Sequence, residues 1–371
     1  MSGSQLWLRF SILAASFPAL ARALLSDPRH SQSHEGWEAA LLRAGEVGVR
    51  ASRYLREMTP DRVRDECREH GVRLISRSDP DYPSRLLETG SPPAMLYARG
   101  QWPHEASQSW VAIVGSRSAV ATGRRAARIL AGWAGVRGAV VVSGLAYGID
   151  GAAHLGALQV GAPTVAVLAA GVERATPRGQ SRLYDRILHE GGAVVSEYPP
   201  GTEARPYRFP VRNRIIAALA HRVVVVEARE HSGALHTVDH ALAMGRPVLV
   251  HPADGLRESA RGGNQLIQEG AELALDPEDL VPQAESFFPN RGKPTRVSQI
   301  SRMVGGLPQL GDDPVPVDEL SRIMGAEPGL LRAAIARLEI LGLVRLEAGG
   351  VRSVGARGIR QAVGPCKSGA A

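Results

Sequence analysis

The stretch that decides the fold runs from Trp110 to Asp150 and reads WVAIVGSRSAVATGRRAARILAGWAGVRGAVVVSGLAYGID. Its first residues, Trp110–Val114, are apolar and partly β-branched, which is typical of a strand covered on both faces. A glycine turn follows, and then a segment with helical spacing from Gly123 to Trp133. A second apolar run, Ala139–Val142, again ends in a glycine turn. This repeat of strand, glycine turn and helix predicts parallel neighbouring strands.

The same pattern continues to about residue 270. Apolar runs separated by helical segments predict further strands at Thr164–Leu168, Ala193–Val195, Arg222–Glu227 and Pro247–His251. Because strands alternate with helices, we expect an α/β domain whose mostly parallel sheet is doubly wound, with helices on both faces.

The glycine turns that end the first two strands predict a site for an anion. They are Gly115-Ser116-Arg117 and the segment from Ser143 to Asp150. The carboxyl ends of parallel strands form the edge where open α/β sheets bind ligands, and free N–H groups at the following helix starts attract phosphate. Ser116 and Ser143 offer hydroxyl groups, and Arg117 offers a bidentate guanidinium group. The alternative is that both are ordinary turns without a ligand.

Two arginines at another helix start point to the same chemistry. After Phe209, the residues Arg212, Asn213 and Arg214 crowd the beginning of a segment with a buried helical face. The positive end of a helix disfavours arginine, so the group makes sense if an anion neutralises it. The alternative is a solvated helix start paired with local acidic residues. A turn of small residues, Ser232-Gly233, ends a further strand in the same way.

Composition favours an anionic partner. The chain of 371 residues has 44 Lys and Arg against 37 Asp and Glu, a net charge of +7, and the usual partner of such a chain is nucleic acid. Lys293 and Lys367 are the only lysines, so genome composition alone could produce part of this bias. The two cysteines lie far apart and predict neither a disulfide framework nor a metal site, which fits a cytoplasmic protein. We expect no cofactor, no metal and no membrane span.

Catalytic motifs are missing from the sequence. It contains no phosphate-binding P-loop, no G-x-G-x-x-G after a strand, no G-x-S-x-G elbow and no H-E-x-x-H. His154, His236 and His240 fall on helices and are interpreted as packing or surface residues. Asp150 and Glu197 could be catalytic acids, but a turn hydrogen bond or a helix cap explains each equally well. A binding surface therefore explains more residues than an active site, and no catalytic residue is assigned.

The motifs together resemble the DNA-processing protein A family, which is also called Smf. The resemblance runs from about Asp81 to Ala271, because separate motifs agree in order and spacing. They are Gly115-Ser116-Arg117, Ser143–Asp150 with His154, Phe209–Ile216, Ser232–Thr237, Asn264–Ile267 and Gly270-Ala271. The chain departs from the family at Thr176-Pro177, where Tyr-Pro is common, and at Pro252–Gly255.

The resemblance implies an extended Rossmann-like domain that binds single-stranded DNA, forms a homodimer, helps to load the RecA recombinase during DNA uptake, and is not an enzyme. Phe209 and Tyr147 are the aromatic candidates for stacking on bases. We expect Arg117→Ala and Arg212→Ala each to weaken oligonucleotide binding without unfolding the chain. The predicted DNA contacts are Gly115, Ser116, Arg117, Ser143, Gly144, Tyr147, Gly148, Phe209, Arg212, Asn213, Arg214, Ser232 and Gly233.

The predicted domain order places smaller modules on both sides of the Rossmann-like domain. Residues 1–68 form a small helical (SAM-like) module, 69–285 the single-stranded DNA-binding domain, 286–310 a linker, 311–357 a winged helix and 358–371 a tail. Two other functions stay open: a nucleotide-phosphate enzyme of the phosphoribohydrolase kind, and a DNA-binding regulator led by the winged helix. A Pro-Gly-Gly-x-Gly-Thr turn, typical of the first, is absent.

Overall fold

The computed structural model describes residues 3–26, 34–103, 109–281, 314–324, 328–340, 344–347 and 349–353. A nine-stranded sheet forms its centre, in the order β1-β2-β6-β5-β4-β3-β7-β8-β9. Pairings from β6 to β9 are all parallel, whereas β1 and β2 join the sheet as antiparallel strands. The strands are Arg73–Ser76 (β1), Met95–Gly100 (β2), Trp110–Val114 (β3), Val140–Ser143 (β4), Thr164–Val167 (β5), Ala193–Ser196 (β6), Arg222–Val226 (β7), Val248–His251 (β8) and Glu272–Leu273 (β9).

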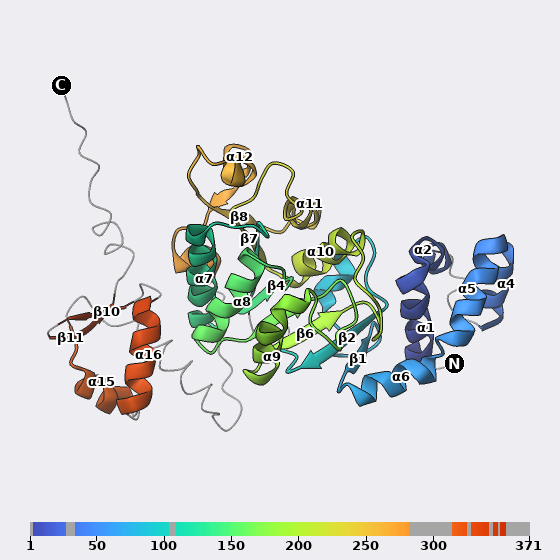
Figure 1. The fold of residues 1–371 in the computed structure, drawn as a ribbon, viewed down its shortest axis with the longest axis horizontal. Helices are drawn as coiled ribbons and strands as arrows, with labels where there is room; N and C mark the ends of the chain where they lie inside the picture. Colours follow the sequence, from blue (N-terminus) through green and yellow to red (C-terminus); the bar gives the residue numbers. More distant parts are fainter. Residues whose placement is uncertain are drawn as a thin grey trace.

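Helices cover both faces of this sheet, as Figure 1 shows, so the prediction of a doubly wound, mostly parallel α/β fold is confirmed. Alternate residues of β3 point to opposite faces: Val111 and Ile113 pack in one hydrophobic cluster, Ala112 and Val114 in another. The helices are Ala121–Val136 (α7), Ile149–Gln159 (α8), Ser181–His189 (α9), Arg208–Leu219 (α10), Leu235–Ala243 (α11), Arg261–Gln268 (α12) and Pro277–Leu280 (α13).

Membership in these two hydrophobic clusters shows which face of the sheet each helix covers. Leu130 of α7 and Ala153 of α8 belong to the cluster of Val111, whereas Ile215 of α10 and Val238 of α11 belong to that of Ala112. In the described part of the chain, short 3-10 turns lie at Ser84–Glu88, Arg178–Gln180 and Glu258–Ala260.

Among the residues that the structure describes, five helices precede the sheet. The first two are separate helices, because Pro18 has no backbone N–H to continue the first one. Phe10 packs edge-on against Trp37 with ring centres 4.3 Å apart. Contacts of α1 and α6 with β1 and β2 place this module at the antiparallel edge of the sheet. The helices are Gly3–Ser16 (α1), Pro18–Ser26 (α2), His34–Arg43 (α4), Gly45–Glu57 (α5) and Pro60–Glu69 (α6).

The C-terminal part contains the elements of a winged helix. Helices α15 (Val317–Met324) and α16 (Pro328–Ile340) precede the antiparallel hairpin of β10 (Val344–Glu347) and β11 (Gly350–Ser353). Leu331, Ile335 and Leu338 of α16 are buried, as their spacing predicts. Residues 286–310 and 358–371, the predicted linker and tail, lie outside the described residues. Within the described part, no helix combines the length and apolarity needed to cross a bilayer.

Candidate functional site

A crevice opens where the chain reverses its direction across the sheet. From β3 the chain proceeds to β4, β5 and β6 on one side, and then returns to β7 on the other side of β3. The loops after β3 and β7 therefore leave in opposite directions, which is where doubly wound sheets bind ligands. A cavity of about 800 Å³ lies there, lined by both loops and by the first turns of α10.

The loop after β3 brings an exposed arginine to this crevice. The Ser116 N–H donates to the carbonyl oxygen of Glu227 at 2.8 Å, and the Ser118 N–H donates to the Ser116 hydroxyl at 3.2 Å. These bonds fix the loop and leave the Arg117 side chain in solvent. Its guanidinium carbon lies 4.8 Å from the centre of the Phe209 ring, so the cation and the aromatic ring form one surface.

Gly148 packs directly against the backbone of the loop after β3. With φ of +77° and ψ of −121°, Gly148 has a backbone conformation that residues with a side chain rarely adopt. A Cβ at this position would also collide with the carbonyl oxygens of Ser116 and Arg117. We expect Gly148→Ala to cost about 2 kcal/mol or more of folding free energy, from strain and displacement of the loop. Chemical denaturation measures this loss. Gly90→Ala is the control, since nothing lies within 4 Å of its added Cβ, and equal stability of the two variants would contradict the assignment.

The N–H groups near two helix starts are already bonded to the chain's own carboxylates. The buried Glu227 carboxylate accepts from the Val120 N–H at 3.2 Å, at the start of α7. The Asp150 carboxylate accepts from the N–H groups of Gly144 and Ala146, at 3.1 and 3.4 Å. These three N–H groups are therefore not free for a phosphate, contrary to what was expected of the backbone at these turns. Asp150 has the turn-bonding role that the sequence allowed as an alternative.

Arg212 lies beneath the crevice rather than in solvent. Its side chain is 3% exposed, and its guanidinium group donates to the carbonyl oxygens of Gly144, at 2.8 Å, and Val167. Burial lowers the pKa of Arg212 to about 10, with Asp150 acting in the opposite direction, so it stays protonated at neutral pH. Burial also raises the pKa of Asp150, against the attraction of Arg212. Arg212 thus joins the ends of two strands, and only its edge faces the crevice.

Some of the other predicted DNA contacts line the crevice, and the rest lie outside it. The Asn213 side-chain amide donates to the carbonyl oxygen of Gly233 at 3.0 Å and ties α10 to the turn before α11. Eight of the thirteen predicted DNA contacts line the crevice, and they are Gly115, Ser116, Arg117, Phe209, Arg212, Asn213, Ser232 and Gly233.

The remaining predicted residues do not line the crevice. Ser143 is fully buried, and its hydroxyl donates to the Ile113 carbonyl oxygen at 2.7 Å. Tyr147 is 49% exposed on the neighbouring turn. Gly144 and Gly148 pack beneath Arg212 and the Arg117 loop. Arg214 faces away from the crevice and forms an ion pair with Glu197 at 2.6 Å. It faces away because residues two positions apart on a helix do not share a face.

The sequence interpretation missed Arg229, which lines the crevice from the loop after β7. Its neighbour Glu230 pairs with Arg261 at 3.1 Å. Within the described ranges, neither Arg117 nor Arg229 has an acidic partner, so both cations are available to an anion. The signal for Arg229 in the sequence is its position three residues before Ser232, in the loop that follows a predicted strand.

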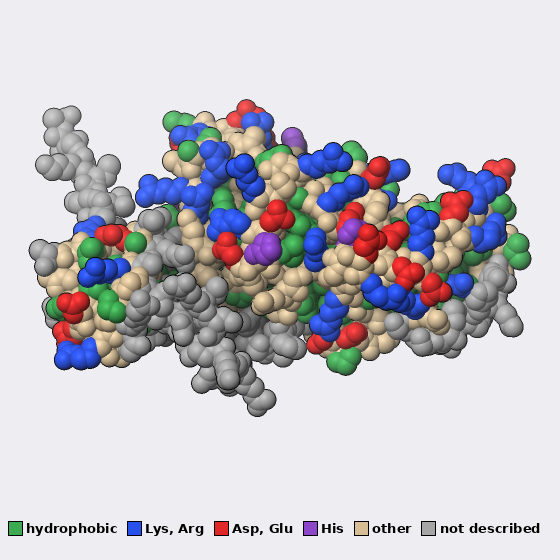
Figure 2. All heavy atoms as spheres, turned by 60° about the horizontal axis from the view of Figure 1, so that its bottom comes forward, with side chains coloured by type: hydrophobic (Ala, Val, Ile, Leu, Met, Phe, Trp, Pro, Cys, Tyr) green, Lys and Arg blue, Asp and Glu red, His purple; other side chains and the backbone are tan. Residues whose placement is uncertain are grey.

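Basic side chains extend beyond the crevice. In Figure 2 they gather over the part of the central domain that contains α7, whereas acidic and basic side chains are mixed toward the N-terminal helices. Arg124 and Arg125 of α7 are exposed. His154 is fully buried and shares a hydrogen bond of 2.7 Å with the Thr164 hydroxyl, in the packing role that the sequence predicts. The described residues contain no group of His, Cys, Asp and Glu that could hold a metal ion.

Comparison with known families matches this arrangement. Residues 73–285, which hold the whole crevice, match the family model of DNA recombination-mediator protein A. The chain belongs to this family. Residues 307–350 match the winged helix domain of DprA, a recombination-mediator protein A, and so confirm the predicted winged helix. The resemblance inferred from the motifs is confirmed.

Relatives of the recombination-mediator family cover most of the chain. A putative DNA processing protein DprA from Mycobacterium tuberculosis is 35% identical over 83% of this chain and 85% of its own length. The crystal structure of DprA from Streptococcus pneumoniae superimposes with a TM-score of 0.63 and 29% identity, over 78% of this chain and 99% of that one. A Helicobacter pylori DprA structure, determined to explain its binding of single-stranded DNA, gives a TM-score of 0.52 and 25% identity, over 58% and 97%.

Proposed function

We propose that the crevice binds the sugar-phosphate backbone of single-stranded DNA. The observation that carries this proposal is the pair of unpartnered cations, Arg117 and Arg229, on the two loops that border a cavity of about 800 Å³. Phosphates of an extended strand would lie between them, and the Phe209 ring beside Arg117 offers a face for a base. The Helicobacter pylori relative, whose structure concerns single-stranded DNA, supports the choice of ligand.

The mechanism is electrostatic and needs no catalytic residue. Arg212 lies beneath the site, where its charge and that of Asp150 attract each other, and its hydrogen bonds to the carbonyl oxygens of Gly144 and Val167 fix the geometry. The exposed arginines then replace counterions on the strand, and affinity should fall as salt rises. We propose that the chain is a binding protein rather than an enzyme.

The family match supports a proposal for the wider role. The matching model is that of a DNA recombination-mediator protein, and we propose that this chain passes single-stranded DNA to the RecA recombinase and forms a homodimer through its Rossmann-like domain. A pull-down with RecA from the same cell, with and without a single-stranded oligonucleotide, tests the partner. Absence of RecA from both samples would count against it.

A nucleotide-phosphate enzyme is the weaker alternative. Enzymes with this fold place a phosphate at the helix start after the first strand of the unit. Here the Glu227 carboxylate occupies the start of α7, and like charge would repel a phosphate at that position. A regulator led by the winged helix would leave the two cations of the crevice without a role.

Arg117→Ala tests the proposed site. We expect about a tenfold loss of affinity for single-stranded oligonucleotide, because one phosphate contact and its stack on Phe209 disappear. The plot of log affinity against log salt should become shallower by about 0.7, the value for one phosphate on a single strand. Fluorescence anisotropy at several salt concentrations measures both quantities.

Two comparisons control this experiment. Arg125→Ala removes an exposed arginine of α7 that does not line the crevice, and should change affinity less. A duplex oligonucleotide of the same length should bind more weakly than the single strand. Preference for duplex, or equal affinity of Arg117→Ala and the unaltered chain, would refute the proposed site.

A further inference from the structure

Arg208, the first residue of α10, is buried although its neighbours Tyr207 and Phe209 are not. Its side chain is 5% exposed, and no side chain caps the start of this helix. The guanidinium carbon lies 4.8 Å from the centre of the Tyr198 ring and 5.6 Å from that of the Tyr207 ring. Contacts of a cation with two aromatic rings restrict its direction, so Arg208 is a fixed group rather than a mobile surface side chain.

The buried guanidinium group of Arg208 joins α10 to the N-terminal helical module. It donates to the carbonyl oxygen of Ala15 at 2.6 Å and to that of Glu203. Ala15 lies in the last turn of α1, where carbonyl groups have no partner within the helix, and α1 has no basic residue of its own in that turn. A cation is favourable at this negative end of the helix dipole. Arg208 of α10 supplies that cation.

Helix α1 gives Arg208 a firm support, because α1 also packs on the sheet. Leu8 and Ile12 of α1 belong to the hydrophobic cluster that contains Tyr97 of β2. The Ser11 hydroxyl shares a hydrogen bond of 2.6 Å with the Tyr97 hydroxyl. These contacts fix α1 independently of α10, so the Ala15 carbonyl oxygen is a fixed acceptor.

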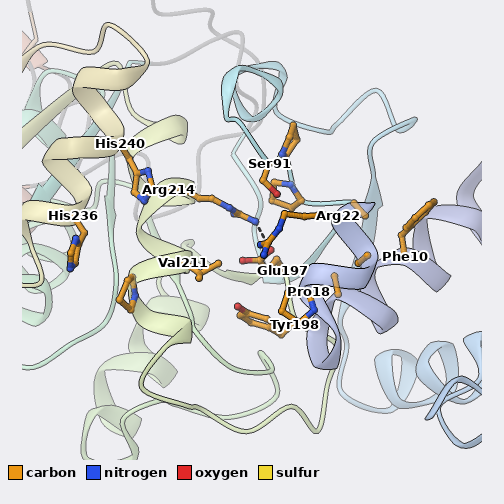
Figure 3. A pocket seen from close by; sticks show the side chains of 16 residues that line it. Phe10, Pro18, Arg22, Ser91, Glu197, Tyr198, Val211, Arg214, His236 and His240 are labelled. Atoms are coloured by element: carbon orange, nitrogen blue, oxygen red, sulfur yellow. Dashed lines mark hydrogen bonds and ion pairs between the residues drawn. The ribbon is translucent and has the colours of Figure 1, made fainter. Parts of the chain in front are cut away.

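Packing between α10 and the module is incomplete beside this hydrogen bond. A cavity of about 330 Å³ is lined by Val211 of α10 and by Phe10 and Pro18 of the module (Figure 3). Tyr198, which contacts Arg208, lines the same cavity. Side chains that line a cavity lack contacts on that side and hold each other weakly. The hydrogen bond from Arg208 to Ala15 crosses the same boundary and is a direct link between the two parts.

The first turn of α10 carries part of the proposed DNA site. Phe209 follows Arg208 in the chain, and its ring lies 4.8 Å from the Arg117 guanidinium carbon in the crevice. A displacement of Arg208 would therefore move the Phe209 ring relative to Arg117. We propose that Arg208 is a positioning residue, through which the N-terminal module holds Phe209 and Arg117 in the arrangement that binds the strand. This inference rests on the proposed function, and it gives the N-terminal module a part in DNA binding.

A double-variant cycle tests whether Arg208 acts through Phe209. Arg208→Met removes the hydrogen-bond donors but keeps an apolar stem. We expect it to lower affinity for a labelled oligothymidylate by at least about fivefold, the lower end of the contribution of one stacked base. Phe209→Ala should also lower affinity, and adding Arg208→Met to it should lower affinity little further, because a positioning residue has no effect without the group that it positions. A merely structural role would reduce stability and leave the affinity of the folded protein unchanged. Fluorescence anisotropy measures affinity, and circular dichroism shows that each variant is folded.

Two further variants make the result decisive. Ser11→Ala removes a different hydrogen bond of α1, the one to β2, and should leave affinity unchanged. Arg208→Lys keeps the charge and a donor, should lose less affinity than Arg208→Met, and replaces it in the cycle if Arg208→Met does not fold. Unchanged affinity in the Arg208 variants that fold, or a loss that persists in full when Phe209→Ala is present, would overturn the inference. Failure of the unaltered chain to bind oligothymidylate would instead refute the proposed function.

Discussion

Arg212→Leu is expected to destabilise the fold by about 2–5 kcal/mol, because each buried polar group left without its partner costs about 1–3 kcal/mol. The substitution leaves the Asp150 carboxylate buried without its cation, and it leaves the Gly144 and Val167 carbonyl oxygens without their common donor. Chemical denaturation followed by circular dichroism measures the free energy of unfolding. This outcome would replace the expectation from sequence that Arg212→Ala weakens DNA binding alone.

Two variants separate charge from packing. Asp150→Asn in the Arg212→Leu background removes the uncompensated carboxylate, so the double variant should lose less stability than the sum of the two single variants. Arg125→Leu changes an exposed arginine of α7 and should change stability by less than about 0.5 kcal/mol. If Arg212→Leu is as stable as Arg125→Leu and only loses DNA binding, Arg212 is a ligand-binding residue and not a structural one.

Mild acid should destabilise the chain through His154. Burial, followed by the charge of Arg212, lowers the pKa of His154 to about 3, below its ordinary value of 6.5. The unfolded chain therefore binds the proton first, and the stability present above pH 6.5 is lost as pH falls toward 3. The slope is about 1.4 kcal/mol per pH unit, so this histidine alone costs about 2 kcal/mol at pH 5.

A second histidine adds to the same loss. Burial, and then the charge of Arg85, lowers the pKa of His221 to about 4. Its Nδ1 accepts from the Trp110 N–H at 2.9 Å, which requires the neutral ring. Partial exposure reduces its contribution relative to that of His154.

Unfolding free energies between pH 7 and pH 4.5 test the role of His154. His154→Gln should flatten the pH dependence by the slope of one group, whatever it does to stability at pH 7. His189→Gln replaces an exposed histidine of α9 and should leave the slope unchanged. Parallel curves for His154→Gln and the unaltered chain would show that His154 does not carry the acid sensitivity.

The positions of the central strands in the chain were predictable, because each is an apolar run between helical segments. The last strand, Glu272–Leu273, was missed since it has only two residues and both are exposed. Strand β2 was not predicted either, because its pairing between β1 and β6 depends on long-range contacts. Local sequence does not encode those partners.

The site was predictable in its loops but not in the direction of its side chains. Gly115, Ser116 and Arg117 followed from the end of the first strand. Arg212 and Arg214 were treated as one cationic group, although helical geometry separates residues two positions apart by about 200°. The roles of Glu227 and Asp150 could not be read from the sequence, because each accepts hydrogen bonds that only the folded loops bring within reach.

The Glu227 carboxylate at the start of α7 affects which anions can compete for the proposed site. A free nucleotide carries its negative charge on the phosphates at one end of the molecule. The Val120 N–H, which could otherwise bind such a phosphate, already donates to the Glu227 carboxylate. A nucleic acid strand does not depend on that N–H group, because its phosphates are spread along the chain and can contact several distant arginines at the same time. Discrimination by length, without any reading of sequence, would keep abundant small anions such as ATP from competing for the protein.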